Sequence, residues 1–161
     1  MKIDYYGELS AQTERIKAML TADSEGRLKL KAEGDKWRRY MTETLEEDHR
    51  PPINRRDLMS IIQNLGYILY EVWRLPLSQT LCAEGDGIQN ELAESIQTLS
   101  EEIEGLKAKK ISASRLRTAA YSLFSVWRNS SQAGYDPLLY EGYEATGDAM
   151  LRLADSLEMA G

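Results

Sequence analysis

The sequence predicts an all-α fold, a single-domain bundle of about six helices over residues 1–161. The first observation is the spacing of the apolar residues, which recur three and four positions apart, whereas strict alternation is rare. The second is length, because 161 residues suit one domain with one substantial core. The third is a pair of breaks, at residues 49–54 and 85–87, where prolines and glycines interrupt the helical pattern.

Residues 3–48 are predicted to form an N-terminal helical pair, with a first helix at about residues 3–22 and a second at about 27–47. Gly34 lies inside the second helix, where glycine costs roughly 1 kcal/mol relative to alanine, which leaves open a kink or a break into two pieces. Pro51 and Pro52 cannot continue a helix. The break at residues 49–54 therefore separates this pair from a main bundle at residues 55–160.

The central helix is predicted from about residue 55 to residue 74. Asn54 is placed to cap it, and Asp57 stands near the positive end of the helix dipole. A wide apolar face indicates burial against more than one neighbour. That face consists of Leu58, Ile61, Ile62, Leu65, Ile68, Leu69 and Val72. A short helical piece at about residues 77–83 is expected to lead to the loop at 85–87.

The next helix, at about residues 88–110, carries a narrow apolar seam of the coiled-coil kind. The seam is only about two and a half heptads long, so we expect it to pack inside the chain and not to form a free-standing dimeric coiled coil. It consists of Leu92, Ile96, Leu99, Ile103 and Leu106. Two more helices follow, the first capped by Ser112 or Ser114 and the second opened by Asp136 and Pro137.

A short motif, Tyr-x-Leu-aromatic-x-Val-Trp-Arg, occurs twice, at residues 67–74 and 121–128. Each copy lies on a helix that is followed by a turn and a long amphipathic helix. This arrangement predicts two similar helical hairpins packed together, as a duplication would produce. Convergent packing explains the motif equally well, because tyrosine, leucine and tryptophan in helical spacing are common in cores.

Charge and composition narrow the class of protein. A net charge of −6 and a pI near 5.0 favour a basic partner over a phosphate backbone or an anionic lipid surface. The N-terminus lacks a signal-peptide pattern, and polar residues interrupt the longest apolar run, so no membrane segment is expected. Cys82 is the only cysteine and forms no internal disulfide, which favours a cytoplasmic protein.

The sequence contains no recognisable catalytic constellation, and no cofactor is expected. His49 is the only histidine, and Cys82 has no histidine near it. Glu91 and Glu94 form a Glu-x-x-Glu pair, which a helix places on one face, where Mg²⁺ can bind. This pair resembles the first half of the metal motif of MazG-type nucleotide pyrophosphohydrolases, so a Mg²⁺-dependent enzyme of that class is one alternative. No Glu-x-x-Asp follows to supply the second half.

Nucleic-acid binding is a second alternative. Five basic residues lie across the turn between two predicted helices without an intervening acidic residue, and such a group can contact phosphates. The lysines at the end of the helix predicted at about residues 88–110 also suit the negative end of that helix's dipole. The group consists of Lys107, Lys109, Lys110, Arg115 and Arg117.

The leading hypothesis is a non-enzymatic protein–protein interaction module, such as an inhibitor, immunity or anti-defence protein or a small complex subunit, of bacterial or phage accessory kind. Tyrosine suits interfaces because its ring is apolar and its hydroxyl is polar. The expected partner is another protein, and a homodimer is kept as an alternative. The candidate partner-binding residues are Tyr67, Tyr70, Arg74, Tyr121, Arg128, Tyr135 and Tyr140.

Overall fold

The computed structural model describes residues 3–75, 86–110, 112–133 and 137–160, apart from the side chains of residues 86–90, 126, 127, 129–133 and 137–140. All regular structure in these ranges is helical, which confirms the predicted all-α bundle. The helix predicted at residues 77–83 and the cap Asp136 lie outside the described residues. The helices are α1 (Tyr5–Met19), α2 (Ser24–Glu47), α3 (Arg55–Arg74), α5 (Asp86–Leu106), α6 (Ala113–Ala133) and α7 (Pro137–Ala160).

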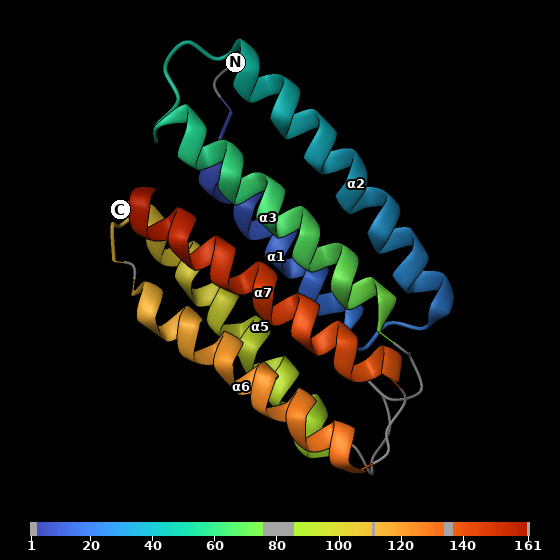
Figure 1. The fold of residues 1–161 in the computed structure, drawn as a ribbon. Coiled ribbons are helices and arrows are strands. Elements are labelled where there is room, and N and C mark those ends of the chain that lie inside the picture. Colours follow the sequence, from blue (N-terminus) through green and yellow to red (C-terminus); the bar gives the residue numbers. More distant parts are fainter. Residues whose placement is uncertain (1–2, 76–85, 111, 134–136, 161) are drawn as a thin grey trace.

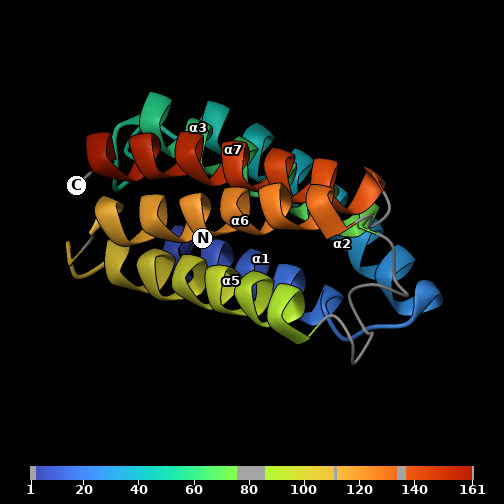
Figure 2. The same ribbon diagram turned by 60° about the horizontal axis from the view of Figure 1, so that its bottom comes forward.

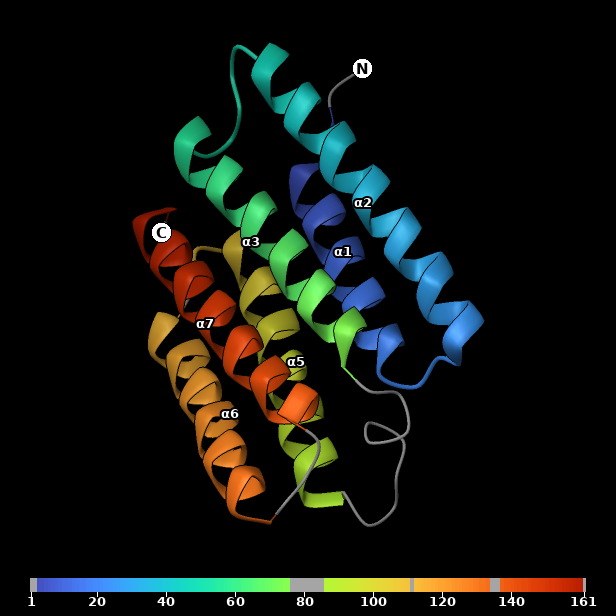
Figure 3. The same cartoon turned by 45° about the vertical axis from the view of Figure 1, so that its right-hand side comes forward.

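Four of the helices form one layer of the bundle. α6, α7, α3 and α2 lie side by side in that order, as Figures 1 and 3 show. α5 and α1 form a smaller second layer behind them, which is seen below the first layer in Figure 2. α5 packs against α6 and α1, while α1 also packs against α2 and α3. As a result, α3 and α7 are the inner members of the larger layer.

One hydrophobic core extends through the described chain and contains residues from all six of these helices. α3 is central to it, because the whole predicted apolar face from Leu58 to Val72 is buried. The seam of α5, from Leu92 to Leu106, is also buried between helices of the same chain, which confirms that it packs internally. Removing these side chains from water is the main force that holds the bundle together.

The two copies of the repeated motif lie on helices with different neighbours. α6 and α7 form a hairpin with extensive contact, whereas α3 packs against α7 and α2 and makes little contact with α5. The predicted N-terminal pair is also divided between the two layers, since α1 packs more extensively against α5 than against α2. The motif therefore does not mark two equivalent hairpins in the described chain.

α2 passes through Gly34 as one continuous helix, so the alternative of a break at this residue is excluded. Gly34 is buried where α2 crosses α3, and a Cβ atom at this position would lie only 2.4 Å from Leu69 Cδ2. The glycine therefore permits a close approach of two helices, and its low helix propensity is offset by that packing.

Polar side chains cap the ends of the helices. Asn54 accepts hydrogen bonds from two backbone N–H groups in the first turn of α3, as predicted. The C-terminus of α3 has a partner that the sequence analysis missed. Arg27, in the first turn of α2, is only 4% exposed and donates hydrogen bonds to the carbonyl oxygens of Leu75, at 2.9 Å, and Val72. It thereby joins the start of α2 to the end of α3.

Tyr5 and Asp48 connect the start of α1 to the residue that follows α2. The buried Tyr5 hydroxyl donates a hydrogen bond of 2.8 Å to Asp48 Oδ2. Burial, together with this bond, raises the pKa of Tyr5 to about 12. Hydrogen bonds from the backbone N–H of Arg50 and from Tyr5 hold the pKa of the Asp48 carboxyl below its ordinary value.

The Tyr5 hydrogen bond predicts a specific alkaline response. Because the pKa of Tyr5 is higher in the folded chain, its contribution to stability is complete below pH 10 and is lost as the pH rises towards 12. Tyr5→Phe is expected to lower the free energy of unfolding by about 1 kcal/mol below pH 10. This difference from the wild type should shrink as the pH approaches 12.

Urea unfolding at a series of pH values, followed by circular dichroism, measures this difference. Tyr121→Phe is the matched control, because Tyr121 is 58% exposed on α6, and it should show almost no difference at any pH. A Tyr5→Phe difference that stayed constant to pH 12 would show that the hydrogen bond does not have this role.

Candidate interaction surface on α2, α3 and α7

The outer face of α2, α3 and α7 carries two exposed tyrosines at its centre. Tyr67 and Tyr70 lie on α3 and are 50% and 41% exposed, although the opposite side of the helix is buried. The guanidinium carbon of Arg152, from α7, lies 5.8 Å from the centre of the Tyr67 ring. That of Arg74 lies 5.5 Å from the centre of the Tyr70 ring. Such contacts are worth roughly 0.5–1 kcal/mol at exposed sites, and here they orient both rings.

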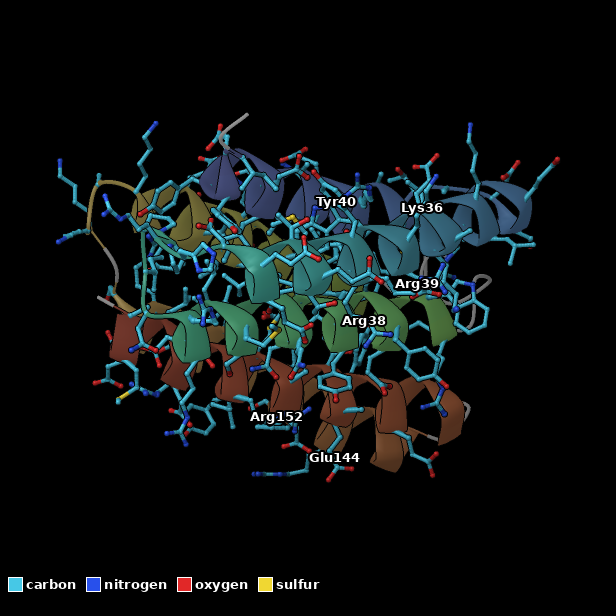
Figure 4. All side chains as sticks on the ribbon, turned by 90° about the horizontal axis from the view of Figure 1, so that it is seen from above. Lys36, Arg38, Arg39, Tyr40, Glu144 and Arg152 are labelled. Atoms are coloured by element: carbon cyan, nitrogen blue, oxygen red, sulfur yellow. The ribbon has the colours of Figure 1, made fainter. Side chains whose placement is uncertain are left out.

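Arg38 reaches the same face from α2, and Figure 4 shows it next to α3. A Cβ atom on Gly66 would lie 2.6 Å from Arg38 Cδ, so the missing side chain at Gly66 gives Arg38 room to lie against α3. The sequence analysis missed Arg38. A glycine inside a long amphipathic helix, directly before Tyr67, is the signal that indicates such a close approach.

A shallow pocket of about 560 Å³ lies beside Tyr67, between α3 and α7. Its lining includes the hydroxyls of Ser60 and Ser156, which are 2.6 Å apart, and the amide nitrogen of Asn64, which donates to both. These groups satisfy one another across the two helices. The pocket therefore makes the surface concave beside Tyr67. It does not contain a nucleophile paired with a general base, as a catalytic site would.

The predicted partner-binding residues do not all share this face. Tyr67, Tyr70 and Arg74 lie on it, whereas Tyr121 is 58% exposed on α6, and α7 separates α6 from α3. Arg128 is exposed on α6 as well. The side chains of residues 135 and 140, the predicted Tyr135 and Tyr140, lie outside the described part of the chain.

The predicted basic group is partly neutralised by neighbouring carboxylates. Arg115 contacts Glu101 at 2.6 Å and Glu102 at 3.2 Å. Arg117 forms ion pairs with Asp155, at 2.8 Å, and Glu158 of α7. The three lysines at residues 107, 109 and 110 are exposed without such contacts in the described chain. Two of the five predicted phosphate contacts are thus already occupied by carboxylates.

The carboxylates considered for Mg²⁺ lie on the outside of α5. Glu91 and Glu94 border a depression of about 170 Å³ that also contains Arg115. On α7, Asp155 and Glu158 are three residues apart as well, but both form ion pairs with Arg117. In the described ranges, histidine, cysteine and carboxylate side chains do not gather into any group of three or more that could hold a metal ion. The described geometry therefore does not bring a second carboxylate pair to Glu91 and Glu94.

Comparison with known proteins leaves the function to be inferred from geometry. No protein-family model matches the chain, and no significant similarity is found to curated proteins or to solved structures. In the part of the chain that the structure describes, no helix combines the length and the apolar character that a membrane span requires. With the basic group partly neutralised and no metal-binding group described, the face of α2, α3 and α7 with its two exposed tyrosines is the candidate interaction surface.

Proposed function

We propose that the protein is a non-enzymatic, cytoplasmic interaction module that binds a protein partner through the face of α2, α3 and α7. The observation that carries the proposal is the pair of exposed tyrosines, Tyr67 and Tyr70, each oriented by an arginine on a well-packed helix. Tyrosine and arginine are enriched among the residues that dominate binding energy. Rigid helices and oriented rings reduce the entropy lost on association.

Local charge modifies the expectation of a basic partner, which came from the net charge of −6. Arg38, Arg74 and Arg152 surround the tyrosines, while the exposed ridge of α7 carries Glu144 and Asp148. Charges of both signs therefore occur on the face. The partner must match this pattern, because local complementarity sets the orientation and specificity of a complex.

Site-specific photo-crosslinking in the native host tests the proposal. A photoreactive phenylalanine analogue at position 67 or 70 should give discrete crosslinked products, and the same analogue at position 40 should not. Tyr40 is the matched control, since it is 52% exposed but lies on the side of α2 away from α3. Equal products at positions 40 and 67, or no product at 67 and 70, would refute the assignment of this face.

A binding titration with the partner that the crosslinking identifies gives the energetic contribution of the rings. Tyr67→Ala combined with Tyr70→Ala should weaken binding by roughly thirtyfold or more, since interface anchors cost about 2 kcal/mol or more on truncation. Circular dichroism should remain unchanged, because both side chains are exposed. Tyr40→Ala should leave binding unaltered.

A further inference from the structure

We propose that the partner docks an acidic segment on this face, with carboxylate side chains over Tyr67, between Arg38 of α2 and Arg152 of α7. The inference rests on the proposed function, since it uses the same surface, and it adds the chemistry of the partner. At the level of Tyr67 it replaces the expectation of a basic partner, which came from the net charge of −6. The charge at the centre of the face is opposite in sign to that of the whole chain.

Arg38 and Arg152 approach Tyr67 from the two helices that flank α3. Arg38 lies against Gly66, because a Cβ atom there would be 2.6 Å from Arg38 Cδ and 3.4 Å from its Nε. The guanidinium carbon of Arg152 lies 5.8 Å from the centre of the Tyr67 ring. Figure 4 shows Arg38 on α2 and Arg152 on α7, with α3 between these helices. Since Gly66 and Tyr67 are consecutive residues, the two arginines stand at one level along α3.

The positive charges of these two arginines are available to a partner. Both side chains are exposed, and neither forms an ion pair within the described chain. By contrast, Arg74, at the Tyr70 ring, pairs with Glu71 at 3.4 Å. A guanidinium group can bind a carboxylate through two parallel hydrogen bonds. The charge complement of the pair at the centre of the face is therefore an anionic group on the partner.

The positive charge is confined to one level of the face, which favours acidic side chains over a phosphate backbone. On α7, the exposed Asp148 lies one helical turn before Arg152. Asp155 lies on the other side of Arg152 and is held by Arg117 at 2.8 Å. A nucleic-acid strand carries a charge at every nucleotide and would bring phosphates against these carboxylates. A polypeptide can place carboxylates at one level and neutral or basic residues at the next.

The shallow pocket beside Tyr67 gives such a side chain a place to enter. Its volume is about 560 Å³, and Arg152 is the cation in its lining. The hydroxyl groups and the amide nitrogen of the pocket bind one another, so they do not compete for Arg152. The ring of Tyr67 provides an apolar surface for the aliphatic part of an aspartate or glutamate side chain.

Charge reversal of the two arginines in the full chain tests the inference. The probe is the protein that crosslinks to position 67, with the crosslinked peptide sequenced by mass spectrometry. Arg38→Glu with Arg152→Glu should weaken its binding at least about tenfold, because like charges then face each other. Arg38→Gln with Arg152→Gln should weaken binding less, and circular dichroism should stay unchanged in both, since both side chains are exposed. Replacing the partner's carboxylates nearest the crosslink by lysine should restore binding to the glutamate variant.

Lys29→Glu with Lys36→Glu is the matched control, because it makes the same charge change at exposed positions of α2, and Lys36 lies away from α3. It should bind as the wild type does. Equal effects of the two double reversals would overturn the inference, as would a crosslinked nucleic acid or a lysine-substituted partner that restores nothing. A protein that crosslinks at position 67 and ignores the reversals leaves the proposed function standing, whereas no product at positions 67 and 70 overturns both.

Discussion

Arg27→Ala is expected to lower the free energy of unfolding by about 2–4 kcal/mol. Arg27 is 4% exposed and donates to the carbonyl oxygens of Leu75 and Val72 at the end of α3. Its removal leaves buried helix-terminal carbonyls without donors and creates a cavity between α2 and α3. Urea unfolding followed by tryptophan fluorescence and circular dichroism measures the change.

Two further substitutions separate the causes of that loss. Arg27→Met keeps much of the packing and removes a desolvated cation, whose burial lowers the pKa of Arg27, so its effect should be smaller than that of alanine. Lys29→Ala, at an exposed position two residues away, should stay within about 0.5 kcal/mol of the wild type. Equal stability of Arg27→Ala and the wild type would remove the structural role assigned to this arginine.

Gly34→Leu is expected to destabilise the bundle by about 3 kcal/mol, at the upper end of the usual cost of overpacking. Even a Cβ atom at position 34 would lie 2.4 Å from Leu69 Cδ2, and a leucine must push α2 away from α3. The expectation from helix propensity has the opposite sign, since leucine is a much better helix former than glycine. Thermal and urea unfolding decide which effect is larger.

Ala32→Leu provides the control for Gly34→Leu, because Ala32 is exposed on the same helix and a leucine there meets solvent. It should change the free energy of unfolding by no more than about 0.5 kcal/mol. A stabilised Gly34→Leu protein would mean that α2 and α3 do not cross closely at this glycine.

Much of the fold follows from local patterns. The spacing of apolar residues located the helices, and the breadth of the face from Leu58 to Val72 identified α3 as central. The seam of α5 was recognised as internal because it is too short for a free-standing coiled coil. Tyr67 and Tyr70 were among the predicted partner-binding residues, because they cannot both share the apolar face of α3, and both are exposed.

The candidate site was predicted only in part. Tyr67, Tyr70 and Arg74 all lie on α3, and the spacing of the apolar residues along this one helix indicates which of its sides faces outward. Arg38 and Arg152 come from helices distant in sequence, and their positions beside Gly66 and Tyr67 depend on how the helices pack. Tyr121 was grouped with the α3 tyrosines by its motif, yet α7 lies between the two helices.

The sequence by itself determined the helical class, the approximate extent of the helices and the buried faces of α3 and α5, because periodicity and capping act within a few residues of chain. The tertiary structure alone decided which helices are neighbours, why Gly34 is a packing residue, and which charges are already paired, as in Arg117 with Asp155. It also decided that Arg38 of α2 and Arg152 of α7 lie beside the tyrosines of α3. Such arrangements depend on contacts between residues far apart in the chain, for which local spacing carries no information.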